Sequence, residues 1–227
     1  MSKSGFIKTS LSRKFWMAAS GLFLIIFLTQ HFLINFLSVI SADTFNSASH
    51  FMGTNPFVQF FAQPILLIGV IFHFVMGFVL ELQNRNARPE KYAYSNPGAN
   101  SSWMSRNMII SGIMILLFLG LHFYDFWVPE IKTKYIDGDV SGLLAGGEFR
   151  YYEELAHKFV DPIRVVIYVL AFVFLSLHLL HGFQSAFQSL GVRHPKYTPL
   201  IMKLGNLFAI VVPLGFAFIA VYHHLAH

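Results

Sequence analysis

The feature that most constrains this chain is a set of five long apolar segments. A helix needs about 20 consecutive apolar residues to cross a bilayer, and each segment is near or above that length. The segments lie at about 15–40, 58–82, 106–128, 162–189 and 202–225. Only 12% of the residues are charged, against about 25% in an ordinary soluble domain. The sequence therefore predicts an all-α, multi-pass membrane protein in which residues 1–227 form a single transmembrane domain.

Composition also excludes several kinds of chemistry from this chain. It has no cysteine, which rules out iron–sulfur clusters, thiolate metal sites and covalently attached c-type haem. It has no glycine-rich flavin-binding fingerprint, and no basic-aromatic pattern that would suggest nucleic acid as a partner. The first apolar segment is too long for a signal peptide and no A-x-A site follows it, so we expect it to be retained.

The distribution of Lys and Arg predicts the orientation in the membrane. Most of the 16 basic residues lie in the N-terminal segment and in the loops after the second and fourth apolar segments. The long loop 129–161 is acid-rich instead. Basic loops stay on the cytoplasmic side, so we expect a cytoplasmic N-terminus and a C-terminus outside.

Histidine occurs in each of the first four segments. Ionisable residues inside a membrane are functional candidates by default, although a hydrogen-bonded packing role is the alternative for any one of them. With a rise of about 1.5 Å per residue, His31 and His122 lie at a similar depth near the outer side. His73 and His178 lie at a second depth nearer the cytoplasm. The remaining histidines are expected to be solvated or interfacial, apart from His181 in the fourth segment; they are His50, His157, His194, His223, His224 and His227.

Two histidines that face each other at one depth suit the two axial positions of a haem iron. A porphyrin is flat and wide, so small residues are expected on the helix faces around it. Gly69 and Gly77 lie four residues before and after His73, and Gly182 lies four residues after His178.

The first and third segments repeat one another when they are aligned on histidine. The stretch "SGLFLIIFLTQHF" matches "SGIMILLFLGLHF" at Ser, Gly, Phe, Leu, His and Phe. Ser20 and Ser111 each lie 11 residues before the histidine, a spacing that returns to nearly the same helical face. They are expected near the level of the inner histidine pair.

The second and fourth segments share the pattern H-x-x-x-G-F, as "HFVMGF" and "HLLHGF". This pattern matches His73 to His178 and places His181 opposite Met76. Depth alone mildly favours His181 as the partner of His73, whereas the pattern favours His178. We weigh the pattern more heavily, because a span boundary can slip by a turn and the register of a motif cannot.

One histidine in each of the first four segments, with "HLLHGFQSAFQSLG" closing the fourth, resembles the five-helix, di-haem cytochrome b subunit of succinate dehydrogenase and fumarate reductase. The resemblance covers nearly the whole chain. It implies two bis-histidine b haems, with His31 and His122 as ligands of the outer one and His73 and His178 as ligands of the inner one. Some members carry a glutamate two residues before the fourth ligand; Ser176 stands there in this chain, which argues against a proton pathway of that type.

The resemblance also implies partners and a location. A flavoprotein subunit and an iron–sulfur subunit would dock on the cytoplasmic side, and a quinone, expected to be menaquinone, would react within the membrane. The location would be a bacterial cytoplasmic membrane, where the complex could form a higher oligomer. Succinate chemistry would occur on the partner subunits, and this chain would pass electrons between them and the quinone.

Polar residues near the two depths are candidates for the haem propionates and the quinone. For the propionates, with interfacial anchoring as the alternative for each arginine, they are Arg13, Ser20, Arg106, Gln184 and Gln188 on the inner side and Arg150 and Arg164 on the outer side. His181 would be a polar neighbour of the inner haem. The quinone candidates in the outer half are Gln30, Asn35, His50, Gln59, Gln63 and Asp125.

Two other functions are consistent with the histidines. One is the di-haem cytochrome b subunit of another quinone-linked enzyme, such as a formate dehydrogenase or a hydrogenase. The other is a haem-free transporter whose histidines form a relay, which would be colourless.

Overall fold

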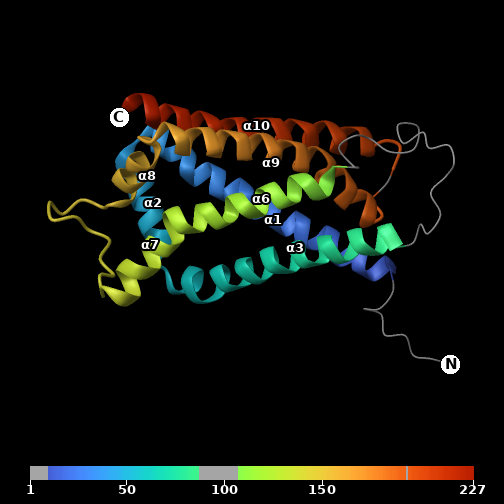
Figure 1. Cartoon of the computed structure of the whole chain (residues 1–227), viewed down its shortest axis with the longest axis horizontal. Coiled ribbons are helices and arrows are strands. Elements are labelled where there is room, and N and C mark those ends of the chain that lie inside the picture. The colour runs from blue at the N-terminus through green and yellow to red at the C-terminus, as the bar shows by residue number, and fades with distance from the viewer. Residues whose placement is uncertain (1–9, 87–106, 193) are drawn as a thin grey trace.

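The computed structural model describes residues 10–86, 107–192 and 194–227, and these residues form a bundle of long helices (Figure 1). Within these described ranges, five helical stretches are long and apolar enough to cross a membrane. They are Leu11–Ile40, Val58–Asn86, Met108–Ile136, Pro162–Ser189 and Thr198–Ala226. In the described residues the only extended pairing is an isolated bridge between Leu143 and Phe149. The prediction of an all-α, multi-pass membrane protein is thus confirmed.

The first stretch is α1 (Ser10–Ile40), the fourth is α9 (Pro162–Ser189) and the fifth is α10 (Thr198–Ala226). The second consists of the π-turn η2 (Val58–Ala62) and α3 (Gln63–Asn86). The third consists of α6 (Met108–His122), the π-turn η3 (Phe123–Trp127), α7 (Val128–Ile131) and the π-turn η4 (Lys132–Ile136). The predicted bounds of the fourth segment are those of α9. The predicted end of the third segment is wrong, because its helix continues to Ile136 and the following loop begins there.

Two short helices lie in the loops on one side of the bundle. In α2 (Ala42–Thr54), the side chain of Ser41 accepts a hydrogen bond from the backbone N–H of Thr44, which is a standard N-cap. In α8 (Tyr151–Phe159), the apolar residues Leu155 and Phe159 are buried. Together with α7 and residues 137–150, these helices cover one end of the bundle, which we call the capped end (Figure 1). The opposite end, where α1 begins and α3 ends, is called the N-terminal end.

Proline accounts for two of the three π-helical turns in the described residues, η2 and η3. Pro64 follows η2 and Pro129 follows η3. A proline has no N–H to donate to the carbonyl four residues earlier, so the regular α-helical pattern cannot pass through it unchanged. Both segments remain helical by widening into a π-turn just before the proline. Pro64 therefore lies inside the continuous helical span Val58–Asn86.

The packing of the spans places two helix pairs on diagonals. α1 packs against both α3 and α9, while α6 packs against α9 and contacts α3. In this four-helix arrangement α1 faces α6 across one diagonal, and α3 faces α9 across the other. α10 lies outside this square, against α9 and α1.

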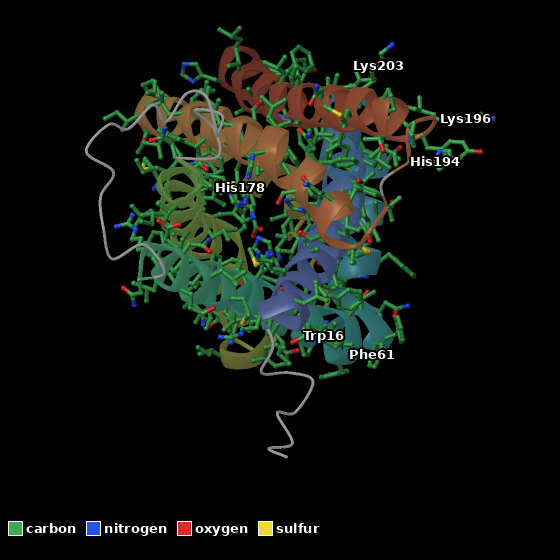
Figure 2. All side chains as sticks on the ribbon, turned by 90° about the vertical axis from the view of Figure 1, so that its right-hand side faces the viewer. Trp16, Phe61, His178, His194, Lys196 and Lys203 are labelled. Atoms are coloured by element: carbon green, nitrogen blue, oxygen red, sulfur yellow. The ribbon has the colours of Figure 1, made fainter. Side chains whose placement is uncertain are left out.

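A hydrophobic core of buried residues, many of them aromatic, lies toward the capped end. It joins α2, α8, α9 and α10 through the buried side chains of Phe45, Phe159, Tyr168, Phe172 and Phe216. Elsewhere large apolar side chains point outward, as on a lipid-facing surface. Seen from the N-terminal end, His178 lies inside the ring of helices, whereas Trp16 and Phe61 lie on its outside (Figure 2).

Candidate cofactor site

The structure brings the four predicted ligands together as two pairs, one on each diagonal. The ring centres of His31 and His122 are 5.7 Å apart, and those of His73 and His178 are 6.3 Å apart. The first pair lies toward the capped end and the second toward the N-terminal end. His73 lies beside Gly21 of α1, which is ten residues before His31, so the two pairs are separated by about 15 Å along the bundle.

These separations fit two imidazoles on opposite sides of one metal ion. A bond between a metal and an imidazole nitrogen is about 2.0 Å long, and the ring centre lies about 1 Å behind the nitrogen. Two axial imidazoles of one haem iron therefore have ring centres about 6 Å apart.

Ser20 fixes the protonation of one histidine in the second pair. Its hydroxyl donates to the backbone carbonyl of Met17 at 2.9 Å, and its oxygen lies 3.0 Å from Nδ1 of His73. Because the hydroxyl hydrogen is engaged, the oxygen is left as an acceptor and Nδ1 of His73 carries the proton. Nε2 then keeps its lone pair, which is the form of imidazole that binds iron.

Ser111 makes the same two contacts on the other side of the bundle. Its hydroxyl donates to the carbonyl of Met108 at 2.9 Å, and its oxygen lies 3.3 Å from Nδ1 of His178. Both histidines of the second pair are thus held by a serine in the form that leaves Nε2 available. The expectation that Ser20 and Ser111 lie at this level agrees with their placement.

The glycine that follows each serine lies beside the same imidazole. A Cβ atom added at Gly21 would lie 3.3 Å from Cε1 of His73, and one at Gly112 would lie 3.8 Å from Cε1 of His178. The contact at Gly21 is tighter than an ordinary van der Waals contact, whereas the one at Gly112 is ordinary. The sequence marks the serines as candidates, and the glycine after each stands in the aligned repeat.

The three glycines that the sequence marks for a haem face, Gly69, Gly77 and Gly182, each lie against a side chain of a neighbouring helix. Their nearest side-chain neighbours are, in that order, Phe23, Met17 and Met108. The contact of Gly77 with Met17 corresponds to the contact of Gly182 with Met108 in the other half of the bundle. The repeat shared by α1 and α6 is therefore M-x-x-S-G, and it packs against the pattern H-x-x-x-G shared by α3 and α9. A role of these glycines beside a porphyrin stays a prediction.

The first pair has a different environment, built from aromatic rings. His31 stacks on Phe27 with ring centres 5.4 Å apart, and His122 has Phe118, Phe126 and Tyr168 around it. The side-chain amide nitrogen of Asn35 lies 3.4 Å from Nδ1 of His31. Nδ1 of His122 has no hydrogen-bond partner among the described residues.

The polar residues predicted to contact the propionates of the inner haem do not form one cluster. Within the described part of the chain His181 forms no hydrogen bond, and Gln184 and Gln188 are exposed. Arg13 is half-buried in α1, and Arg106 lies outside the described residues. Their role toward propionates stays a prediction.

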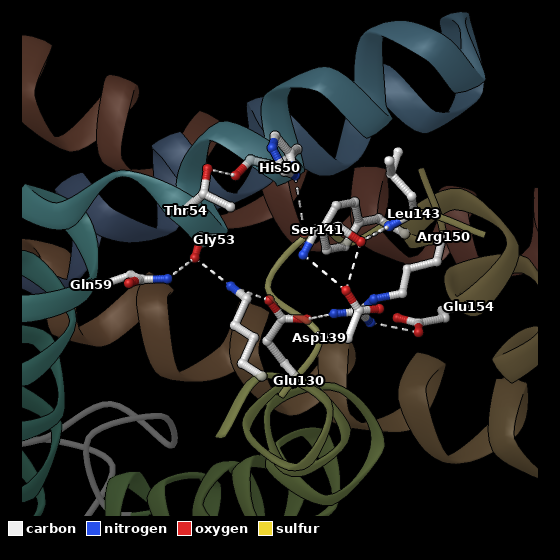
Figure 3. A network of polar contacts seen from close by, with 12 residues as sticks. His50, Gly53, Thr54, Gln59, Glu130, Asp139, Ser141, Leu143, Arg150 and Glu154 are labelled. Atoms are coloured by element: carbon white, nitrogen blue, oxygen red, sulfur yellow. Dashed lines mark hydrogen bonds and ion pairs between the residues drawn. The ribbon is translucent and has the colours of Figure 1, made fainter. Parts of the chain in front are cut away.

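A polar network at the capped end contains several of the remaining candidates (Figure 3). The guanidinium of Arg150 binds the carboxylates of Glu130 and Glu154, and Lys134 lies 2.5 Å from Glu130. The ammonium of Lys134 also donates to the carbonyl of Gly53. Arg150 and Lys134 are both buried. The network ties the end of the third span to the last turn of α2 and to α8.

Two quinone candidates lie at the edge of this network. The side chain of Gln59 donates to the carbonyl of Gly53, and the ring of His50 stacks on Phe149 with centres 4.2 Å apart. Nearby, burial raises the pKa of Tyr151 to about 12, with the charge of Glu130 acting in the same direction. Gln30 donates weakly to the sulfur of Met52 at 3.5 Å and Gln63 is exposed. Asp125 is separate from them and deeply buried.

The expectation that the C-terminal histidines are solvated or interfacial is wrong for His223. It is fully buried, and its Nε2 lies 2.9 Å from the hydroxyl of Ser38 in α1. His224 lies 2.9 Å from the carbonyl of Phe159. The reason is that α10 packs along α1 and α9 as far as α8, so its last turn is covered by the cap.

Comparison with known proteins gives one distant match. The chain is 22% identical over 194 residues to the succinate dehydrogenase cytochrome b558 subunit of Bacillus subtilis (strain 168), and the match covers 86% of this chain and 85% of that protein. No protein-family model matches the chain, and no solved structure matches it. The similarity, which extends over most of both chains, supports a place among the cytochrome b membrane subunits of succinate dehydrogenase.

Proposed function

We propose that this protein is the membrane-anchor subunit of a succinate:quinone oxidoreductase of the five-helix, single-subunit type, with two b haems. The observation that carries this proposal is the pair of histidine couples on the two diagonals, with ring centres 5.7 Å and 6.3 Å apart. The distant likeness to a succinate dehydrogenase cytochrome b558 subunit supports the assignment to this enzyme rather than to another quinone-linked dehydrogenase.

The chain's own residues would hold and orient the cofactors. His31 with His122 would hold one haem, and His73 with His178 would hold the other. Bound in this way, the haems would supply one-electron transfer through the membrane. Around the second pair, the serine oxygens accept from Nδ1 and keep each ring in one tautomer and one orientation. The aromatic shell of the first pair lowers the local polarity and excludes water, which is a second means of setting a haem potential.

The N-terminal end would face the cytoplasm and bind an iron–sulfur subunit that carries a flavoprotein subunit. The chain has no cysteine for clusters of its own, so electrons from succinate must come from such partners. The pair His73 and His178 lies nearer this end. Electrons would pass from it to the pair at the capped end and to a quinone, for which we propose menaquinone, in a bacterial cytoplasmic membrane.

Spectroscopy of the purified complex tests the proposal. The reduced-minus-oxidised spectrum should show b-type α-band absorption, and a pyridine haemochrome assay should give two haems per chain. A fully loaded preparation with one haem per chain would overturn the two-site assignment. A colourless protein would overturn the haem assignment altogether and favour a histidine relay.

A further inference from the structure

A buried carboxylate that takes no part in the two histidine pairs lies beside the pair at the capped end. Asp125 belongs to the π-turn η3, and only 1% of its surface is exposed. Its Oδ2 accepts a hydrogen bond of 2.8 Å from the hydroxyl of Tyr168 in α9. Its Oδ1 lies 3.5 Å from Nη2 of Arg164 and accepts no hydrogen bond from a described residue. A buried carboxylate with a free acceptor position needs an explanation.

A cavity of about 750 Å³ connects this carboxylate to the capped end. Asp125 and Pro129 line it from the third span, α8 supplies much of the remaining wall, and the chain closes it with its last residue. The titratable groups along the wall are Tyr152, Glu153, Glu154, His157, Lys158 and His227. Most of the lining surface is apolar, but the cavity is open to the surface and its titratable groups reach from Asp125 to the capped end. These groups give Asp125 a route for protons to water at that end.

On its other side, Asp125 is linked to the histidine pair through Tyr168. The ring of Tyr168 is 2% exposed, and its centre is 6.4 Å from that of His122. Asp125 follows His122 by three residues, and the π-turn between them alters the direction of its side chain relative to a regular helix. Turns of this kind occur frequently at functional sites.

We propose that Asp125 is the group that exchanges protons between water at the capped end and the quinone reaction beside the His31–His122 pair, with Tyr168 as its positioning residue. This proposal rests on the proposed function. Reduction of a quinone to the quinol consumes two electrons and two protons, and the reverse reaction releases them. The electrons come from the redox partners named above. Asp125 gives a proton to the quinone and is reprotonated by water in the cavity, or does the reverse when the quinol is oxidised.

The charges around Asp125 suit such a role. Nη2 of Arg164 lies 3.5 Å from Oδ1 of Asp125, and about a quarter of the arginine side chain is exposed. Its charge therefore stabilises the carboxylate without a hydrogen bond that would occupy Oδ1. The hydroxyl of Tyr168 donates to Oδ2 and keeps that oxygen in place. Oδ1 remains available to take up a proton. A purely structural ion pair between η3 and α9 would instead leave proton exchange unchanged when the charge is removed.

The test compares Asp125→Asn, Tyr168→Phe and the control Asp43→Asn in the intact, haem-loaded complex. Asp43 is an exposed carboxylate in α2, at the same end of the molecule and away from the cavity wall. Two quantities are measured: the pH dependence of the midpoint potential of each haem, and quinone turnover relative to turnover with a soluble dye that accepts electrons at the partner subunits. In the unmodified complex the potential of the haem at the capped end should fall as pH rises, because proton uptake accompanies the electron.

Asp125→Asn should abolish that slope and lower quinone turnover by about tenfold or more, while haem content and dye turnover stay unchanged. Tyr168→Phe should weaken both effects in the same direction, and Asp125→Glu should restore them in part. Asp43→Asn should behave as the unmodified complex. Should Asp125→Asn fail to assemble, Tyr168→Phe and Asp125→Glu decide the matter by the same two measurements.

An unchanged slope and quinone turnover within twofold of the unmodified complex would overturn the role of Asp125 and leave the proposed function intact. Absence of b-type absorption from the unmodified complex would instead overturn the proposed function. The two failures are therefore distinguishable.

Discussion

At the scale of single residues, the two serines have the most direct influence on the proposed iron ligands. Each accepts a hydrogen bond from Nδ1 of one histidine while its own hydrogen is held by a backbone carbonyl. A hydroxyl in this position keeps Nε2 of the ring unprotonated and directed to the metal. Partners of ligating histidines usually matter by about 10-fold to 100-fold in metal affinity.

Ser111→Ala should weaken haem binding by about that factor at the His73–His178 site, and leave the other haem in place. The physical reason is the loss of the acceptor for Nδ1 of His178, which frees the ring to rotate or change tautomer. Titration of haem into the depleted complex measures the two affinities. Ser176→Ala, two residues before His178 on α9, is the matched control and should bind both haems normally. Equal loss of both haems from Ser111→Ala would contradict the prediction.

His178 rather than His181 should be the ligand opposite His73. The ring of His178 is bonded to Ser111 and faces Gly112, and these contacts have counterparts at His73. His178→Ala should lose one haem, measured by haemochrome content, while His181→Ala should keep both. If His181→Ala loses the haem and His178→Ala retains it, the assignment is wrong.

Much of this site can be predicted from the sequence, because histidine is rare inside a membrane and its depth can be counted along a helix. The pairing of His31 with His122 and the level of the serines follow from such counting, whereas the choice of His178 over His181 rests on the H-x-x-x-G-F pattern. The roles of Gly21, Gly112, Met17 and Met108 do not follow from either. A glycine or methionine in an apolar helix is ordinary, and its contact with one particular ring depends on helix rotation, which the pattern of apolar residues around a lipid-facing helix leaves undetermined.

At the scale of helices, α10 is tied to the bundle by one buried polar contact and by aromatic packing. Nε2 of His223 lies 2.9 Å from the hydroxyl of Ser38, which itself donates to the carbonyl of Asn35 at 2.6 Å. Two turns earlier in α10, Phe216 stacks on Phe172 of α9 with ring centres 5.4 Å apart. The polar contact fixes the register of α10 against α1, because only one position along the helix satisfies it.

Ser38→Ala should lower the free energy of unfolding by about 1–3 kcal/mol, the cost of leaving a buried nitrogen without its acceptor. Thermal unfolding of the purified protein in detergent measures this, and a double-mutant cycle with His223→Ala separates the pair from its surroundings. Ser47→Ala, at an exposed position of α2, is the control. Strictly additive effects of the two substitutions would show that the contact has no energetic weight.

Helices that cross the membrane were predictable and those that cap it were not. The membrane spans can be recognised in the sequence by their length and hydrophobicity, whereas α2 and α8 are short and mix polar with apolar residues. Their helical state depends on packing against the end of the bundle, as the burial of Phe45 and Phe159 shows. The third span was predicted too short because its continuation from 128 to 136 contains Pro129 and three charged residues, and tertiary contacts of Glu130 and Lys134 compensate for them.

At the scale of the whole molecule, the arrangement in the membrane can be tested because the chain has no cysteine. Asp43→Cys places one thiol at the capped end and Asn86→Cys places one at the N-terminal end, both at exposed positions. With the predicted orientation, a membrane-impermeant maleimide added to intact cells with an accessible outer face should label the first variant. It should label the second only after the membrane is opened. The reverse pattern would contradict a cytoplasmic N-terminal end.

The two histidine couples interleave along the chain, since the first span pairs with the third and the second with the fourth. Biogenesis on the ribosome proceeds from the N-terminus, so His31 meets His122 once three spans have been inserted, while His73 must wait for His178 in the fourth. The couple at the capped end can therefore acquire its haem first, and a nascent chain halted after η4 would contain one complete set of ligands and one solitary histidine. Maturation of the cofactors would then follow the order of translation.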